Sequence, residues 1–238
     1  MNKVDISVIL PVYNESECIE DVISELVQAL SEIESITSYE IIAVNDGSTD
    51  NTCEKLLEMA KTIQCLVVLD TVTNMGQSAA LGMGIKAAAG ALICTIDADG
   101  QNNPYDIKNC IKAMRDESAD ACCGWRKNRH DVKSKKIGSR LANSIRRAVL
   151  KDGVIDTGCS MRVIKAEFLK SLQIWNGMHR FLPALVKMQH GTIAQIPVDH
   201  RDRKTGKSNY TNWARLKKTI LDLFGVWWMK KRIVVYKK

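Results

Sequence analysis

The sequence has no hydrophobic run long enough to cross a lipid bilayer. The longest apolar run near its carboxyl end covers residues 223–229 and is closed by Asp222 and Lys230, whereas a membrane-spanning helix needs about 20 apolar residues. The amino-terminal MNKVDISVIL also lacks the basic leader, the apolar region and the small-residue cleavage site of a secretory signal. We therefore expect a cytoplasmic protein without a transmembrane helix.

A cysteine pattern typical of metal binding or of disulfide formation is also missing. The eight cysteines form no C-x-x-C pair, and no histidine follows them at ligand spacing. Most of them lie inside apolar segments, so we expect free, buried thiols in a reducing compartment. The sequence therefore disfavours a domain stabilised by structural zinc or by disulfides.

Positive charge is scarce in the first half of the chain, and negative charge is scarce in the second. Residues 1–125 hold 7 Lys and Arg against 20 Asp and Glu, a balance of −13, whereas residues 126–238 hold 27 against 7, a balance of +20. This excess of positive charge predicts that the second half binds an anionic partner. Charge alone allows nucleic acid, a phosphorylated substrate or an acidic membrane surface.

What the chain does have is a regular alternation of apolar, β-branched runs and segments of helical periodicity. Its 238 residues, 45% of them hydrophobic, suffice for one substantial core. Expected strands are 6–12, 39–44, 65–70, 91–96 and 119–123, and the expected helices between them are 15–34, 50–61, 78–89 and 104–115. Such βα units predict an α/β fold with a mostly parallel sheet and helices on both faces.

After Trp125 the pattern changes. We expect a basic helix at 134–151, a turn at 154–160, a helix near 178–189, a strand at 192–198 and a basic loop through residue 210. The last segment, 213–236, is an amphipathic basic helix whose apolar residues follow helical spacing: Trp213, Leu216, Ile220, Leu223 and Trp227. It either packs on the sheet edge or lies in a membrane interface, and the sequence leaves both open.

Two carboxylates follow the fourth expected strand in ICTIDADGQNNP (93–104). Residues at a spacing of two share one side of a strand, so Asp97, Asp99 and Gln101 are placed to converge. Like charges this close repel, and oxygen ligands of this kind attract a hard divalent cation. The position is also favourable, because ligands of open α/β sheets bind beyond the carboxyl ends of the strands.

The first two expected strands end in polar residues as well, in PVYNE (11–15) and NDGSTD (45–50). Helix capping by Asn14, Thr49 or Asp50 accounts for some of them, but not for Glu15 or Asp46. Three acidic strand ends from consecutive βα units fall on one edge of one sheet. They make a polar pocket suited to a base, a ribose and a metal-bound diphosphate.

PVYNE, NDGSTD and DADGQ, in this order, resemble the family-two inverting glycosyltransferases of GT-A fold. Five further segments resemble the polyprenol-phosphate glycosyltransferases, the dolichol-phosphate mannose synthase group: GWRKNR (124–129), GSRLAN (138–143), DTGCSMRV (156–163), GMHRFLPALV (177–186) and RKTGKSNY (203–210). The resemblance implies a GT-A domain at 1–210, with a nucleotide and metal half at 1–125 and an acceptor half at 126–210. Residues 211–238 then form the terminal helix and tail.

The resemblance also implies roles on the donor side. The residues matching nucleotide-sugar contacts are Pro11, Tyr13, Glu15, Asp46 and Asp97, together with Arg203 and Ser208 in a loop over the donor diphosphate. Asp97, Asp99 and Gln101 match the positions around Mg²⁺ or Mn²⁺, and Asp99 is also a catalytic candidate. Asn209 stands where family members often have Lys. The role of that lysine is therefore either unfilled in this chain or taken by Lys207.

On the acceptor side, Arg126, Arg140 and Ser144 match a set that grips the phosphate of a polyprenyl phosphate, and both arginines are catalytic candidates. The implied reaction moves a sugar from GDP-mannose or a UDP-sugar to that phosphate at the inner face of a membrane. A transferase of the same fold with a non-lipid acceptor is the alternative. The sugar, the lipid and the oligomeric state are left open by the sequence.

Three other classes fit the residues less well. A haloacid-dehalogenase-type phosphatase usually carries its Asp-x-Asp motif on the first strand, whereas two βα units precede Asp97 here. A dinucleotide-dependent oxidoreductase needs a G-x-G-x-x-G after the first strand, and none is present. The basic second half carries no recognised nucleic-acid-binding motif, so we expect no nucleic-acid partner.

Overall fold

The computed structural model describes residues 4–127, 143–201 and 212–234, with side chains from residue 219 onward in the last range. Its strands are β1 (Ile6–Val12), β2 (Tyr39–Asn45), β3 (Leu66–Asp70), β4 (Leu92–Thr95), β5 (Ala121–Arg126), β6 (Arg162–Lys165) and β7 (Ile193–Val198). Its α-helices are α1 (Ile19–Ser31), α2 (Thr52–Ala60), α3 (Gln77–Ala87), α4 (Asp106–Asp116), α6 (Ala166–Lys170), α7 (Leu182–Met188) and α8 (Asn212–Arg232). A 3-10 turn, η1 (Met178–Arg180), precedes α7, and residues 143–150 are helical.

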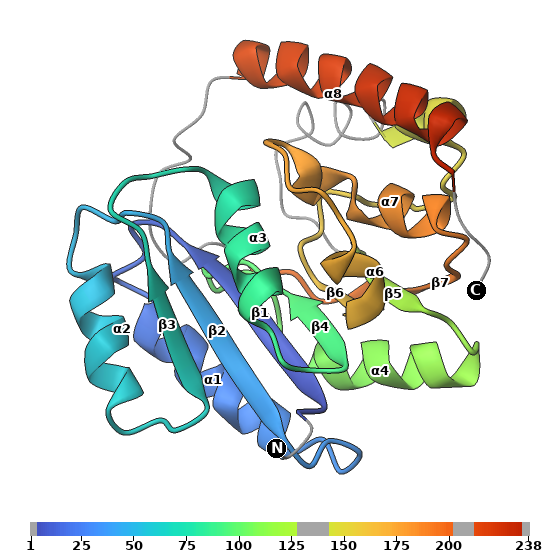
Figure 1. Cartoon of the computed structure of the whole chain (residues 1–238). Helices are drawn as coiled ribbons and strands as arrows, with labels where there is room; N and C mark the ends of the chain where they lie inside the picture. The colour runs from blue at the N-terminus through green and yellow to red at the C-terminus, as the bar shows by residue number, and fades with distance from the viewer. Residues whose placement is uncertain (1–3, 128–142, 202–211, 235–238) are drawn as a thin grey trace.

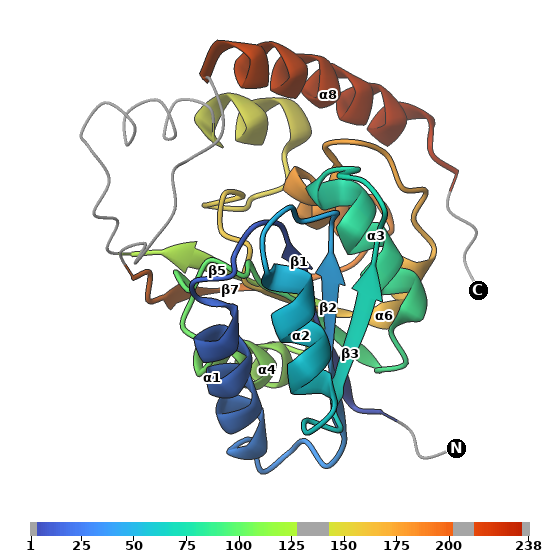
Figure 2. The same cartoon turned by 90° about the vertical axis from the view of Figure 1, so that its left-hand side faces the viewer.

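One seven-stranded sheet forms the centre, in the order β3-β2-β1-β4-β6-β5-β7. All neighbouring pairs are parallel except those of β6, which runs antiparallel between β4 and β5. Helices cover both faces, and α8 lies across the end of the molecule toward which β2 and β3 point (Figures 1 and 2). The α/β architecture expected from the sequence is confirmed.

The core has two layers because the central strands are apolar on both sides. Alternate residues of β1, such as Val8 and Leu10, pack against α1, α2 and α4, whereas Ile9 faces the layer of α3, α6 and α7. Side-chain alternation along a strand produces this division. Because both of its faces are packed, the sheet can hold the polar residues at the ends of its strands in fixed positions.

The structure corrects several expected boundaries. The helix expected from residue 15 begins at Ile19, because the Ser16 amide donates to Asp50 (3.2 Å) and Asn14 adopts φ 55°, which holds residues 14–18 in a turn. The helix expected near 178–189 divides into η1 and α7. Strand β6 and helix α6 were not expected, because a four-residue strand that begins with a charged arginine shows no apolar run.

The terminal helix packs against the rest of the domain, and its expected place in a membrane interface stays a prediction. Leu223 and Val226 are buried against the layer of α3 and α7, and Lys230 donates to the carbonyl of Leu150 at the end of the 143–150 helix. Of the predicted apolar residues Ile220, Leu223 and Trp227, only Leu223 is buried, whereas Ile220 and Trp227 are 45% and 37% exposed. A second face, with Leu221 and Phe224, is exposed. Among the described residues, no helix is long and apolar enough to cross a membrane.

Candidate active site

The strand order places a crevice at the carboxyl ends of β1 and β4. The chain runs from β1 outward to β2 and β3 and then returns to add β4 on the other side of β1, which is the switch point where open α/β sheets bind ligands. A cavity of about 520 Å³ lies there, and Pro11, Thr95 and Asp97 form part of its wall. Residues from the 143–150 helix, η1 and α8 complete it, including Ile145, His179 and Leu223. The cavity thus extends from the sheet edge to α8.

Asp97 and Asp99 lie in the loop after β4, as the sequence predicted. The Asp97 carboxylate accepts a hydrogen bond from Gln77 Nε2 (2.9 Å) at the start of α3. The backbone amide of Asp97 donates to Ser160 Oγ (3.2 Å). Asp99 Oδ1 accepts the amide of Gln101 (3.2 Å), which closes a tight turn with Gly100 at φ 71°. The loop therefore holds both carboxylates beyond the end of β4, and Asp97 lines the cavity.

The electrostatics around Asp97 favour a cation. Burial and then the neighbouring charge of Asp99 raise the pKa of Asp97 to about 6, although Ser160 and the guanidinium groups of Arg162 and Arg126 oppose the rise. A carboxylate whose ionised form is disfavoured by burial and by a like charge gains when a divalent ion binds beside it.

The residues present fit a divalent ion that is only partly coordinated by protein. The described residues contain no group of three or more His, Cys, Asp or Glu side chains arranged to hold a metal. Two carboxylates and the Gln101 side chain, whose Nε2 donates to the Arg201 carbonyl (3.3 Å), supply oxygen atoms of the kind that Mg²⁺ and Mn²⁺ accept. Such a set leaves coordination positions for the oxygens of a diphosphate.

The residues expected on the nucleotide side lie at the ends of β1 and β2. Pro11 lines the cavity, Tyr13 is exposed, and the Glu15 amide donates to Thr52 Oγ1 (3.0 Å). The buried Asp46 carboxylate accepts the amides of Met75 and Gly76, both at 2.8 Å. Asp46 therefore shapes the loop that leads into α3, and its contact with a nucleotide base stays a prediction.

Gly47, which follows Asp46, must be glycine. Its φ is 63°, and a Cβ there would lie 2.5 Å from the carbonyl carbon of Thr73. This close approach brings the 71–76 loop against the end of β2, where Asp46 can bind it.

Arg126, at the end of β5, is held by an acid that sequence reasoning missed. Its Nε and Nη2 donate to the two oxygens of Asp156 at 2.7 and 3.0 Å, and a Cβ on Gly158 would lie 2.5 Å from Nη2. Burial acts to raise the pKa of Asp156, but the hydrogen bonds and charge of Arg126 outweigh it and lower the pKa. One edge of the Arg126 guanidinium is thus committed to protein, while the residue lines the cavity.

The other expected acceptor residues are only partly described. Ser144 is exposed in the 143–150 helix, where Arg147 Nη2 approaches its hydroxyl at 3.4 Å. Arg140 lies outside the described residues, as do Arg203, Ser208 and the rest of the basic loop. Their assignment to phosphate stays a prediction.

Two further residues that sequence reasoning missed, Ser160 and Arg162, build the cavity. Ser160 Oγ accepts the Asp97 amide and also Asn102 Nδ2 (3.0 Å), so it ties the two ends of the acidic loop together. Arg162, only 4% exposed, donates to the carbonyls of His179 (2.9 Å) and Thr157 (2.8 Å). The one signal for them was the DTGCSMRV segment itself, most of which the sequence predicted to be a turn.

Two solved structures have a similar architecture. The chain aligns over 97% of its length with 81% of glucosyl-3-phosphoglycerate synthase from Mycobacterium tuberculosis, in complex with Mn²⁺, UDP and glucosyl-3-phosphoglycerate, at 18% identity and a TM-score of 0.68. It also aligns over 94% of its length with 64% of a mannosyltransferase from Pyrobaculum calidifontis in complex with GDP-Man and Mn²⁺, at 20% identity and a TM-score of 0.68. The fold is therefore the GT-A fold.

The model of glycosyl transferase family 2 matches residues 7–173, and the chain belongs to this family. A dodecaprenyl-phosphate galacturonate synthase from Rhizobium johnstonii is 32% identical over 230 residues, which are 95% of this chain and 67% of that protein. The family expected from the sequence motifs is confirmed, and the protein is a glycosyltransferase.

Proposed function

We propose that this enzyme transfers a sugar from a nucleotide-diphosphate sugar to the phosphate of a polyprenyl phosphate, with inversion at the anomeric carbon. The observation that carries the proposal is one cavity whose wall joins Asp97, one of the two carboxylates, to arginines and then to an apolar side under α8. An amphiphilic phosphate fits such a cavity. The similarity to a dodecaprenyl-phosphate galacturonate synthase supports the same acceptor class.

On the donor side, Asp97, Asp99 and Gln101 would hold Mg²⁺ or Mn²⁺ against the donor diphosphate, and the ion would neutralise charge on the departing nucleoside diphosphate. Gln77 and Ser160 keep the Asp97 carboxylate in place for this purpose. The two solved relatives bound to Mn²⁺ and a nucleotide support a divalent ion at this edge of the sheet.

On the acceptor side, no general base is required. A phosphate monoester has a second pKa near 6, so about nine-tenths of it is dianionic and nucleophilic at neutral pH. Arg126, fixed by Asp156, would grip this phosphate together with Arg140 and orient one oxygen toward the anomeric carbon. Direct displacement of the diphosphate by that oxygen inverts the anomeric centre.

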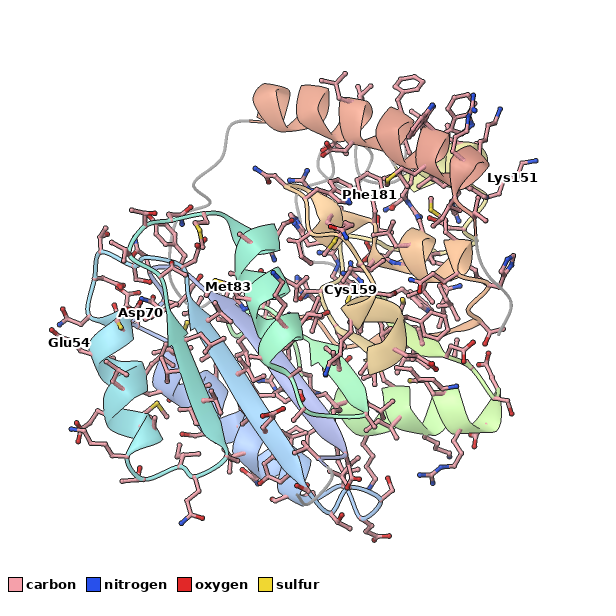
Figure 3. All side chains as sticks on the ribbon, in the orientation of Figure 1. Glu54, Asp70, Met83, Lys151, Cys159 and Phe181 are labelled. Carbon is pink, nitrogen blue, oxygen red and sulfur yellow. The ribbon has the colours of Figure 1, made fainter. Side chains whose placement is uncertain are left out.

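The first isoprene units would lie along the apolar side of the cavity. This wall combines residues from α3, the 143–150 helix, η1 and α8: Leu81, Ile145, Phe181, Ile220 and Leu223. Figure 3 shows Phe181 below α8, with Cys159 nearer the sheet. Each buried methylene of a lipid contributes about 0.8 kcal/mol, so a short stretch of chain contributes appreciably to binding.

The exposed face of α8 would rest on the membrane that holds the acceptor. Leu221, Phe224 and Trp228 are 71%, 60% and 58% exposed and share one side of the helix by their spacing. The last turn of α8 adds exposed basic residues, and Lys151 lies next to it (Figure 3). An apolar face flanked by cations suits an interface rich in anionic lipid.

The test is a panel of nucleotide sugars with polyprenyl phosphate and Mn²⁺ or Mg²⁺, analysed by mass spectrometry for a lipid-linked sugar. We expect product with at least one donor, and none when a chelator is in excess. Parallel reactions with water-soluble phosphate monoesters serve as the control. Transfer only to the soluble acceptors would overturn the lipid assignment while leaving the family intact.

A further inference from the structure

We infer that Arg201 is a positioning residue for the divalent ion: its carbonyl orients the amide of Gln101, and its ion pair with Glu25 fixes the end of the loop after β4 (residues 97–103). The inference deepens the proposed function and rests on it for the presence of the ion. Arg201 lies beyond β7, 100 positions from Gln101 and 176 from Glu25, so only the fold brings the three together.

The chain that leaves β7 pairs with the second half of this loop. His200 and Asn102 form an antiparallel bridge, and the Arg201 amide donates to the Gln101 carbonyl at 2.8 Å. Asp97, in the first half, is held separately by α3 and by the segment before β6. The two halves of the loop therefore depend on different parts of the fold, and Arg201 belongs to the part that holds Gln101.

A further contact orients the side chain of Gln101. Its Nε2 donates to the Arg201 carbonyl at 3.3 Å. Because a carbonyl oxygen can only accept, the NH₂ end of the amide must face it, and the amide oxygen lies at the other end. That oxygen is the atom that Mg²⁺ or Mn²⁺ would bind. The position of the Arg201 backbone therefore determines which end of the Gln101 amide a cation meets.

The side chain of Arg201 anchors this backbone on α1. Its Nη1 and Nη2 donate to the two carboxylate oxygens of Glu25 at 2.8 and 2.7 Å, and Nη2 also donates to Asn103 Oδ1 at 3.3 Å. A fork of this kind fixes direction as well as distance. Helix α1 is itself fixed in the core, because Ile23 and Leu26, close to Glu25 in the sequence, are both fully buried.

Helix α1 also supports the turn before Gln101. Gly100 adopts φ 71°, and a Cβ there would lie 3.7 Å from Val22 Cγ2, so the turn rests against the helix. Helix α1 thus supports Gln101 twice, directly through this turn and indirectly through Arg201.

The exposure of the Arg201–Glu25 pair separates positioning from stability. The two side chains are 42% and 29% exposed, and ion pairs with this access to water add little to stability. Metal affinity, in contrast, requires ligands held to within about 0.5 Å. Loss of the pair should therefore weaken ion binding by about tenfold, the lower end of the range for residues that orient metal ligands, with little change in unfolding.

Electron paramagnetic resonance of free Mn²⁺ measures binding to the full chain, alone and with UDP or GDP. Arg201→Met should weaken Mn²⁺ binding by about tenfold. Glu25→Gln should also weaken it, because the fork loses its charge. Lys55→Met is the matched control, since it breaks a second ion pair on α1, with Glu20, and should bind Mn²⁺ as the wild type does. Urea unfolding of each variant checks that the fold is retained.

A double variant tests the route through Gln101. Gln101→Ala removes the amide oxygen and should weaken Mn²⁺ binding by itself. Because Arg201 acts through that side chain, adding Arg201→Met to Gln101→Ala should weaken binding by less than about threefold more. Full additivity of the two losses would contradict the inference.

Turnover at graded Mn²⁺ gives an independent readout. Arg201→Met should need about tenfold more Mn²⁺ and should approach the wild-type kcat at saturation, which a misfolded enzyme would not do. Wild-type Mn²⁺ affinity in Arg201→Met would overturn the inference and leave the proposed function intact. Absence of Mn²⁺ binding by the wild type, even with UDP or GDP, would overturn the metal site of the proposed function as well.

Discussion

Replacing Asp97 by asparagine should make the protein more stable at neutral pH while abolishing its activity. Burial and the charge of Asp99 raise the pKa of Asp97 from its usual 3.8 to about 6, which corresponds to about 3 kcal/mol against the ionised form. Because the carboxylate lines a cavity that water reaches, we expect about 1–3 kcal/mol of this to appear as a gain in stability. Asparagine retains an acceptor for Gln77 Nε2, so that hydrogen bond need not be lost.

The sign of the pH dependence follows from the same raised pKa. Below about pH 4, Asp97 is protonated in both the folded and the unfolded chain, and its burial carries no charge penalty. Between about pH 4 and 6 the unfolded chain ionises while the folded one stays protonated, so the wild type loses stability relative to the variant. Above about pH 6 the difference is constant.

Urea unfolding followed by tryptophan fluorescence at pH 4.5 and at pH 7.5 measures the effect. Asp156→Asn is the matched control, because the pKa of Asp156 is lowered in the fold and its neutralisation should destabilise the protein at neutral pH. Transfer by Asp97→Asn should fall by about 100-fold or more, since the ion that it helps to hold supplies several kcal/mol. The reasoning fails if the variant is less stable than wild type at pH 7.5, or if its advantage is the same at both pH values.

Four further outcomes are expected. Asp99→Asn should abolish transfer with the fold intact by circular dichroism, and normal turnover would remove Asp99 from the metal site. Asp46→Ala should cost about 1–3 kcal/mol of stability, because the amides of Met75 and Gly76 lose their acceptor, and calorimetry should show weaker nucleotide binding. Arg126→Lys should raise the KM for polyprenyl phosphate more than that for the donor, since lysine cannot keep the fork with Asp156. Serine at both Phe224 and Trp228 should reduce binding to anionic vesicles by at least about tenfold, and unchanged sedimentation with vesicles would contradict the membrane face.

Local signals in the sequence were enough to predict the first half of the fold. Strand β1 has the predicted bounds because its apolar, β-branched residues are buried on both faces, and the acidic loop follows β4 as its spacing indicated. Strand β6 could not be predicted in this way, because it begins with Arg162, a buried charge in the middle of the sheet. Its stability depends on carbonyls supplied by distant segments.

Contacts between residues far apart in the chain also limited the prediction of the active site. Strand-end motifs indicated Asp97 and Asp99, whose spacing alone brings them together. The Arg126–Asp156 pair and the Ser78–His179 contact join residues 30 and 101 positions apart, and no local pattern specifies which partners meet. The second face of α8 was also missed, because helical spacing identifies an apolar face but does not say which side the core covers.

Phosphorus NMR of the reaction product tests most directly the claim that the acceptor's phosphate is the nucleophile. With ¹³C-labelled donor sugar, polyprenyl phosphate and diamagnetic Mg²⁺, we predict that the phosphomonoester signal disappears. It should be replaced by a phosphodiester coupled to the anomeric carbon, in the inverted configuration. A phosphomonoester that persists while sugar is released or attached to another group would contradict the account.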